Sequence, residues 1–337
     1  MSQWAEPGIE ELGGGIFRVP LPLPNDGLRA VNVYVLTGTD GLLLIDGGWA
    51  LAESAERLAQ ALQQIGCRLD EIRQFLVTHL HRDHYTQAVA LRSRFGATVS
   101  LGAGERPNLD RIQDWLTGRR PAEDFAQLHR AGAKPLLDLL KARQGEDVPD
   151  PENWLPPDEW LADRAEVRAG ERRLTVIATP GHTRGHVVFH DAAAGQLFAG
   201  DHVLPHITPS IGFEPLRTAF PLRDYLDSLR LMFQLPDARL LPAHGPVTDS
   251  VHQRVTELLA HHEDRLAASA KAVQAGAATG YEVARALGWT RRHRAFDDLD
   301  PFNQLLAVSE TAAHLDVLVL QGRLGSSTNP DGIEIYQ

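Results

Sequence analysis

Short runs of apolar residues, each closed by a turn, recur along the first hundred positions of the chain. Runs of this length bounded by Gly, Asp and Thr are typical of strands, whereas apolar residues repeated every three or four positions are typical of helices. The first pattern predicts strands at 15–19, 30–36, 42–45, 75–77 and 97–101. The second predicts a helix at about 51–65, where Leu58, Leu62 and Ile65 share a face, and another that ends near Phe95.

Strands return in the middle of the chain, and helices dominate its end. We expect strands at 174–179, 187–190, 196–198 and from 240, with a helix at 222–233. After residue 249 the pattern predicts a long helix at 251–274, a short helix at 281–287 that Thr279 can cap, a helix at 301–321 and a terminal hairpin. This order is the outline of a winged helix, so we divide the chain into domains at 1–250 and 251–337.

The region between residues 104 and 164 breaks the earlier pattern. Helical stretches at about 109–116, 122–129 and 135–142 precede a proline-rich segment at 148–157. We interpret 104–164 as a helical insertion, which either packs against the surface or a second subunit, or forms a lid over a metal pocket. For the lid, the candidate apolar residues are Trp115, Phe125, Trp154 and Trp160.

The amino-acid composition excludes several classes of protein and of binding site. The chain has 337 residues, with 44 acidic against 33 basic side chains and a net charge of −11, which disfavours a surface built to hold nucleic acid. A single cysteine, Cys67, excludes an intramolecular disulfide and a thiolate-rich metal site. The first residues lack the basic and apolar regions of a signal peptide, and no apolar run reaches membrane-spanning length. We therefore expect a soluble cytoplasmic protein.

The most informative stretch is 78–84, which follows the predicted strand at 75–77. It contains His79, His81, Asp83 and His84, and imidazole with carboxylate suits zinc, iron or manganese. Side chains alternate along a strand, so His79 and His81 point the same way if the strand continues to them. The chain must then turn, and this brings Asp83 and His84 toward the same space from another side. Such an arrangement can hold two metal ions rather than one.

Three further candidate ligands each follow the end of a predicted buried strand: His182, Asp201 and His244. Strand ends that converge at one edge of a sheet can place their side chains around one point. The motifs that contain them are Gly-His-Thr-Arg-Gly-His at 181–186, Gly200-Asp201, and Pro-Ala-His-Gly at 242–245.

With the 79–84 cluster, these motifs resemble the five motif positions of the metallo-β-lactamase fold superfamily, and Asp46 in the run Leu-Ile-Asp-Gly-Gly matches its first motif. The resemblance spans roughly residues 15 to 250, with a metal site similar to that of the glyoxalase II type. The part from Pro242 to the end looks like the β-lactamase-like protein 2 branch, which carries a C-terminal winged-helix-like domain.

The resemblance implies an α/β fold, a four-layer αββα sandwich with two metal ions at its edge. Zinc is the expected metal, and iron or manganese is possible. By that pattern His79, His81 and His182 hold the first ion, Asp83, His84 and His244 hold the second, and Asp201 bridges them beside a hydroxide. Asp46 and His186 would orient the ligands from behind. A bound metal lowers the pKa of water from about 16 to about 7, which fits hydrolysis. Asp83 is the candidate proton shuttle, and Asp201 the second catalytic candidate.

Several reactions remain open, because this fold hosts many. We favour hydrolysis of a carboxylic ester, thioester or lactone, with a small molecule as substrate and a homodimer as a possible assembly. The first alternative is an endoribonuclease or phosphodiesterase, because the β-lactamase-like protein 2 branch includes endoribonuclease activity and a winged helix is often a nucleic-acid module. The acidic balance argues against it, and we interpret the short basic cluster at 285–294 as a solvated face. The second is a mononuclear iron persulfide dioxygenase, and the least favoured is a winged-helix binder with a relic site. A redox di-iron site is disfavoured because it usually has a carboxylate where His81 stands.

Overall fold

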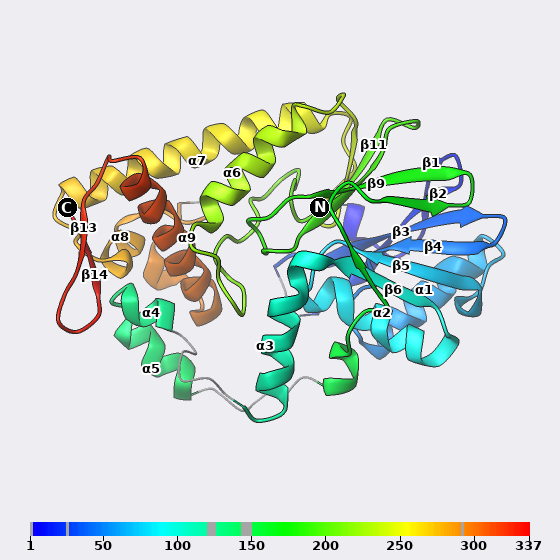
Figure 1. Ribbon diagram of the computed structural model, residues 1–337, viewed down its shortest axis with the longest axis horizontal. Helices are drawn as coiled ribbons and strands as arrows, with labels where there is room; N and C mark the ends of the chain where they lie inside the picture. The colour runs from blue at the N-terminus through cyan, green and yellow to red at the C-terminus, as the bar shows by residue number, and fades with distance from the viewer. Residues whose placement is uncertain (1–2, 25–26, 120–125, 143–149, 291–292) are drawn as a thin grey trace.

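The fold is a sandwich of two β-sheets with helices on both outer faces (Figure 1). The computed structural model describes residues 3–24, 27–119, 126–142, 150–290 and 293–337. From one side of the molecule to the other, the layers are helix, sheet, sheet and helix. This order confirms the α/β four-layer architecture expected from the motifs.

The first sheet has seven strands in the order β1-β2-β3-β4-β5-β6-β7. The strands up to β4 pair antiparallel, and those from β4 onward pair parallel through helical crossovers. Helix α1 (Ala52–Gln64) connects β4 to β5, and α2 (Arg82–Phe95) connects β5 to β6. The strand bounds are β1 Glu10–Gly13, β2 Ile16–Pro22, β3 Ala30–Gly38, β4 Gly41–Ile45, β5 Ile72–Val77, β6 Thr98–Gly102 and β7 Glu159–Leu161.

The second sheet has five strands in the order β12-β11-β10-β9-β8. Neighbouring strands are antiparallel except β11 and β12, which are parallel. The connection between β11 and β12 contains helix α6 (Pro221–Met232). It follows that β9, β11 and β12 all run in the same direction, so their carboxyl ends lie at one edge. The strand bounds are β8 Glu166–Ala169, β9 Arg172–Ala178, β10 Val187–Asp191, β11 Gln196–Gly200 and β12 Arg239–Pro242.

Side-chain alternation along the strands builds the layers. On β3, Val33 and Val35 face a core shared with α1 and α2, while Tyr34 and Leu36 face the second sheet. On β10, Phe189 faces the first sheet, and the neighbouring positions on the other face pack against the helices beyond. Every one of these side chains is buried, so the two sheets meet over a continuous apolar layer.

The C-terminal part contains α7 (Val251–Gln274), α8 (Gly280–Ala286), α9 (Pro301–Leu320) and the strand pair β13 (Ser326–Thr328) and β14 (Glu334–Tyr336). Thr279 caps α8 as expected, because its hydroxyl accepts a hydrogen bond from the Glu282 backbone N–H at 3.2 Å. Side chains of α6, α7 and α9 share one core with the outer face of the second sheet. The winged-helix assignment and the boundary at residue 250 stay predictions.

The region 104–164 is not wholly helical, which corrects the expectation for it. It supplies α3 (Arg106–Leu116), α4 (Ala126–Arg130) and α5 (Lys134–Ala142), but also β7, which extends the first sheet beyond β6. Trp154 and Trp160 pack in the core under the first sheet. Phe125 lies outside the described residues, and the lid stays a prediction.

Among the residues that the structure describes, no helix is long and apolar enough to cross a membrane.

Candidate metal centre

The carboxyl ends of four strands deliver the predicted ligands to one edge of the sandwich. His79 and His81 lie between β5 and α2, and Asp83 and His84 lie in the first turn of α2. The other three follow the parallel-running strands of the second sheet, His182 after β9, Asp201 after β11 and His244 after β12. The structure therefore brings together all seven side chains named from the sequence, in two groups.

The first group consists of His79, His81, His182 and Asp201, whose candidate ligand atoms lie within 4.8 Å of one another. Nε2 of His182 is 3.3 Å from Nε2 of His79 and 3.1 Å from Nδ1 of His81. Oδ2 of Asp201 is 3.4 Å from the same His182 nitrogen. Three ring nitrogens and one carboxylate oxygen thus surround a common point, as a four-ligand zinc site requires.

The second group consists of Asp83, His84 and His244. Oδ2 of Asp83 lies 3.6 Å from Nε2 of His84 and 3.5 Å from Nε2 of His244. Oδ1 of Asp201 lies 3.7 and 3.3 Å from the same two nitrogens. Asp201 therefore turns one carboxylate oxygen toward each group, which is the arrangement that a bridging ligand needs.

Hydrogen bonds behind the rings fix which nitrogen faces the centre. Nδ1 of His182 is 2.8 Å from the Ser210 carbonyl oxygen, and Nδ1 of His244 is 2.8 Å from that of Ala30. A carbonyl only accepts, so each Nδ1 carries the proton and donates it. The Nε2 lone pair of each ring is therefore free for a cation.

Asp46, at the end of β4, supports the ligands from beneath. Its carboxylate accepts hydrogen bonds from the Thr78 backbone N–H at 2.8 Å and from the Thr78 hydroxyl, and Oδ2 lies 2.9 Å from Nδ1 of His84. The backbone of Asp46 has φ of 62°, in the left-handed region that few residues other than glycine, asparagine and aspartate adopt. The unusual conformation aims the carboxylate at the neighbouring ligand segment.

His186, at the start of β10, holds the segment of the bridging residue. Its Nε2 accepts a hydrogen bond from the Asp201 backbone N–H at 3.1 Å, so its Nδ1 carries the proton and donates to the Thr179 hydroxyl at 2.9 Å. Gly200 makes this approach possible. A Cβ there would lie 2.7 Å from Nε2 of His186 and 2.8 Å from Cβ of Thr78, and φ at Gly200 is +51°.

Burial keeps the rings of the first group neutral at pH 7. It lowers the pKa of His81 to about 3 and that of His182 to about 4, because the charged ring is poorly solvated there. Burial and the neighbouring His84 also hold the pKa of His79 well below its usual value. A neutral imidazole offers a lone pair, which is the form that binds a metal ion.

The second group has the opposite electrostatics. Burial alone would lower the pKa of His84, but the carboxylates of Asp83, Asp46 and Asp201 outweigh burial and raise that pKa to about 10. Burial would raise the pKa of Asp83, but His84 and His244 hold it below its usual range. Asp83 is therefore ionised at neutral pH, the state in which a carboxylate binds a cation.

A divalent cation fits these residues. Within the described part of the chain, buried Nε2 atoms of His84 and His244 and buried Oδ1 of Asp201 have no hydrogen-bond partner. A buried polar atom without a partner costs about 1–3 kcal/mol. Metal binding would displace the Nε2 proton that the carboxylates favour on His84. The three atoms would then all be acceptors that meet across the same space, and a cation would supply what each of them lacks.

The centre is reached from solvent beside His81 and Asp83, which are the two partly exposed ligands. The Phe213 ring lies 6.5 Å from the His81 ring, and Phe302 at the start of α9 stacks edge-on against Phe213 at 5.4 Å. The Phe302 side chain is 50% exposed. Sequence reasoning did not single out these two rings, because no motif marks them and they meet only when α9 packs beside the 210–218 loop.

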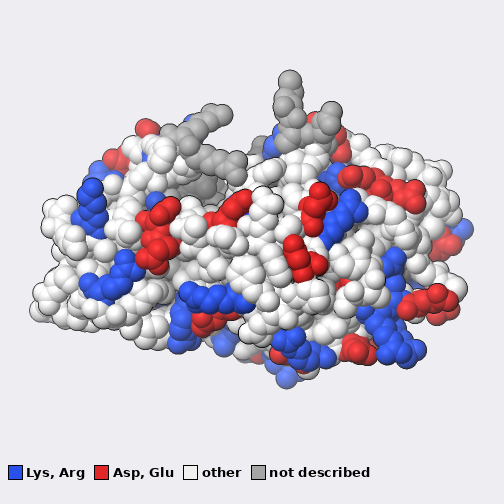
Figure 2. All heavy atoms as spheres, turned by 90° about the horizontal axis from the view of Figure 1, so that it is seen from above, with Lys and Arg blue, Asp and Glu red and all other residues white. Residues whose placement is uncertain are grey.

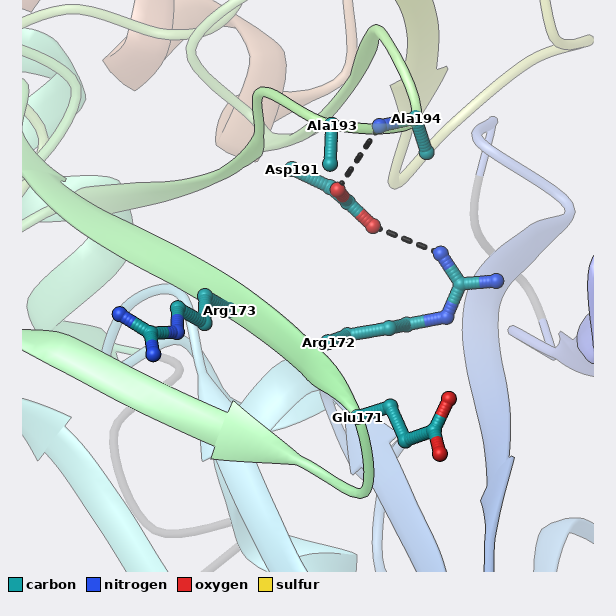
Figure 3. A pocket seen from close by; sticks show the side chains of 6 residues that line it. All are labelled: Glu171, Arg172, Arg173, Asp191, Ala193 and Ala194. Carbon is teal, nitrogen blue, oxygen red and sulfur yellow. Dashed lines mark hydrogen bonds and ion pairs between the residues drawn. The ribbon is translucent and has the colours of Figure 1, made fainter.

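A surface hollow elsewhere carries no part of the centre. It is lined by residues 171–173, 191, 193 and 194, and Arg172 and Asp191 form an ion pair there at 2.7 Å (Figure 3). Arg172 begins β9 and His182 follows the other end of that strand, so the hollow lies at the opposite edge of the sheet. Its lining also carries Glu171 and Arg173, and none of its residues is a candidate metal ligand.

Comparison with known proteins gives a family match over residues 26–244, to the family described as the metallo-beta-lactamase superfamily. A Bacillus subtilis (strain 168) protein named probable metallo-hydrolase YqjP is 25% identical, across 89% of this chain and 90% of its own length. A beta-lactamase-like protein 2 homolog from Caenorhabditis elegans is also 25% identical, across 92% of this chain and 82% of its own.

A third relative, from Gallus gallus, is named acyl-coenzyme A thioesterase MBLAC2. It is 27% identical, across 69% of this chain and 78% of its own length. Among solved structures, a beta-lactamase domain protein from Burkholderia ambifaria superposes with a TM-score of 0.80 at 27% identity. That likeness covers 100% of this chain and 95% of the other, so it includes the C-terminal helices.

Proposed function

Because the chain belongs to the metallo-β-lactamase superfamily, we propose that it is a hydrolase that cleaves a carboxylic ester, thioester or lactone. We propose that it uses two divalent metal ions, with zinc preferred to iron or manganese. One observation carries the proposal more than any other. Asp201 directs Oδ2 to a group of three histidines and Oδ1 to a second group, at distances of 3.3 to 3.7 Å from the histidine nitrogens.

Two ions in these groups would lower the pKa of a shared water and so supply hydroxide at neutral pH. The chain's own residues do the rest. His79, His81 and His182 would hold one ion, Asp83, His84 and His244 would hold the other, and Asp201 would contribute one carboxylate oxygen to each group. Asp46 and His186 keep the ligand segments in place through the hydrogen bonds described above. Asp83, a partly exposed ligand at the open side, is our candidate for passing on a proton released from water.

A thioester with an apolar acyl part is the substrate class that the surroundings favour. Phe213 and Phe302 form an apolar wall beside His81, one of the two partly exposed ligands. Burying about half of a phenylalanine side chain against an acyl chain stabilises a complex by about 1 kcal/mol. The Gallus gallus relative, which is named an acyl-coenzyme A thioesterase, supports the same class.

Charge supports a small substrate over RNA. On the face in Figure 2, basic and acidic side chains are interspersed. In the tail cluster, Arg285 is paired with Asp297 at 2.8 Å, and residues 291 and 292 lie outside the described residues. A protein that tracks a phosphate backbone needs a concentrated basic face.

Metal analysis with a substrate panel tests the proposal. Protein purified without added metal, then loaded with zinc, should hold two ions per chain. It should hydrolyse acyl thioesters faster than lactones, a chromogenic β-lactam or RNA, lose this activity with a chelator and regain it with zinc. Asp201→Ala should lose more than the roughly 10–100-fold that follows removal of an outer hydrogen-bond partner.

Three results would count against the proposal. One iron per chain with oxygen consumption on a persulfide would indicate the dioxygenase. Salt-sensitive RNA cleavage that exceeds ester turnover would indicate the nuclease. An Asp201→Ala variant as active as the parent would remove the two-ion centre altogether.

A further inference from the structure

We propose that two buried asparagines outside the ligand set are positioning residues, and that each braces a different metal group. Asn108 on α3 braces the first group, and Asn32 on β3 braces the second. The inference rests on the proposed two-ion centre. It adds that each ion site is supported by its own asparagine, one on a helix and one on a strand.

Asn108 is buried, and each of its amide atoms is bonded. Its Nδ2 donates to Oε2 of Glu214 at 2.8 Å and to Oε2 of Glu105 at 3.1 Å. Its Oδ1 accepts from the Leu216 backbone N–H at 3.0 Å. One amide therefore links two carboxylates and a loop, and no other uncharged side chain of this size offers two donors and an acceptor in this geometry.

The two carboxylates continue the brace to the first ligand group. Oε1 of Glu105 accepts from the Leu80 backbone N–H at 3.4 Å and from the Thr183 hydroxyl. Leu80 lies between His79 and His81, and Thr183 follows His182. Glu105 thus touches both segments that carry the histidines of the first group.

Glu214 closes the network on the other side. Its Oε2 also accepts from the Arg184 backbone N–H at 2.9 Å, two positions after His182. Its own loop supplies the Ser210 carbonyl that accepts from Nδ1 of His182. The backbones meet closely here, because a Cβ on Gly185 would lie 2.1 Å from the Glu105 nitrogen.

Glu105 depends on these neutral donors. It is fully buried, and burial raises its pKa to about 7. The groups that favour its charged form are the hydrogen bonds from Thr183, Asn108 and Leu80. Loss of one donor to a buried carboxylate is costly, so removing the Asn108 amide should loosen the ligand segments as well as the helix.

Asn32 makes the equivalent connection to His244. Its Nδ2 donates to the carbonyl oxygens of Pro242 at 2.9 Å and Gly245 at 2.8 Å, which flank that ligand. Its Oδ1 accepts from Nη1 of Arg18 at 2.9 Å, and its backbone N–H donates to the Ala243 carbonyl. Asn32 is fully buried, so the 242–245 loop is fixed to β3 on three sides.

The two braces do not overlap. Among the described residues, the hydrogen bonds of the Asn108 side chain reach Glu105, Glu214 and Leu216, and those of the Asn32 side chain reach Arg18, Pro242 and Gly245. The structure therefore separates support for the two ions, and a variant at either position should affect one ion.

Zinc affinity measured in two single-group backgrounds tests this separation. His84→Ala leaves the first group as the strong site, and His81→Ala leaves the second. In the His84→Ala background, Asn108→Ala should weaken zinc binding by about 10–100-fold, and Asn32→Ala by less than about threefold. In the His81→Ala background the order should reverse. Competition with a chromogenic chelator gives both affinities without any activity measurement, and Co²⁺ absorption reports the ligand geometry.

The isosteric variants Asn108→Asp and Asn32→Asp keep the experiment decisive if the alanine variants fail to fold. Each replaces a donating NH₂ by an oxygen that faces carboxylate or carbonyl oxygens, so each should show the same selectivity. Equal weakening of both ions by both variants, or no weakening by either, would overturn the inference. A parent protein that binds fewer than two ions would instead overturn the proposed function, so the two failures are distinguishable.

Discussion

Oδ2 of Asp46 lies 2.9 Å from Nδ1 of His84, and the other oxygen of the same carboxylate accepts from the Thr78 backbone. His84 belongs to the second ligand group, and Thr78 precedes His79 of the first. One buried carboxylate therefore supports both groups, in contrast to the two asparagines, which each support one.

Asp46→Asn should accordingly weaken binding of both ions, by about tenfold or more each. Asparagine tolerates the left-handed backbone at this position, so the effect comes from the lost acceptor and charge. Chelator competition measures both affinities. Asp191→Asn is the control, because Asp191 is an equally buried carboxylate paired with Arg172 at the far edge of the sheet. Unchanged zinc affinity in Asp46→Asn would contradict the role described for it.

Gly200→Ala should destabilise the protein more than Gly195→Ala. Both glycines have positive φ, +51° and +61°, so both variants should lose about 1–2 kcal/mol from backbone strain. A Cβ at Gly195 meets no atom within 4 Å, whereas one at Gly200 meets His186 and Thr78. Overpacking should cost Gly200→Ala about a further 1–3 kcal/mol. Urea unfolding of the metal-free variants measures the difference, and equal losses would show that the neighbours move aside freely.

Phe302→Ala should raise KM for a long-chain acyl thioester by roughly fivefold, since about 1 kcal/mol of apolar contact is removed. For a short-chain thioester KM should stay unchanged, because the short chain does not reach the wall. Leu320→Ala is the matched control: this residue is equally exposed at 51% but ends the same helix, about 27 Å further along the axis. Equal KM values for Phe302→Ala and the parent on both substrates would exclude the apolar wall from substrate binding.

Acid should destabilise the C-terminal helices through His314. Nδ1 of His314 donates to the Glu310 carbonyl at 2.8 Å, and Nε2 lies 3.1 Å from Nδ1 of His262. Burial lowers the pKa of His314 to about 3, the Glu310 hydrogen bond opposes this, and Arg265 and His261 add to it. The unfolded chain takes up this proton near pH 6.5 and the folded chain does not, so stability falls as pH drops below 6.5 toward 3.

The matching measurement is the unfolding free energy of metal-free protein at pH 7.5 and 5.5. His314→Gln should lose about 1.4 kcal/mol less than the parent between these two values, because one titrating group is gone. Parallel losses in the two proteins would mean that His314 protonates equally in both states.

Much of the centre could be predicted from sequence, because metal binding restricts both residue type and position. Only a few side chains can act as ligands, and His182, Asp201 and His244 each follow an apolar strand. The long helices were predictable to within a few residues, since their apolar spacing is regular. The four-layer arrangement followed from the motif resemblance.

The remainder depends on contacts that sequence patterns do not carry. Strands β1, β7 and β8 are short and partly exposed, so they lack a strand-like apolar pattern and form because a neighbouring strand is available. In the sequence, Asn108 looks like an ordinary helical residue. Its role depends on contact with Glu214, which is more than a hundred positions away in the chain. Phe302 gains a partner only through the packing of α9 near the 210–218 loop.

The order in which a ribosome releases the ligands follows from their spread along the chain. His84 emerges early with β5 and α2, but His244, which completes the second group, follows roughly 160 residues later. At usual elongation rates of about 5–20 residues per second, that interval lasts about 8–32 seconds. During it the nascent polypeptide carries only part of the ligand set, so acquisition of the two proposed ions must wait until His244 has been synthesised.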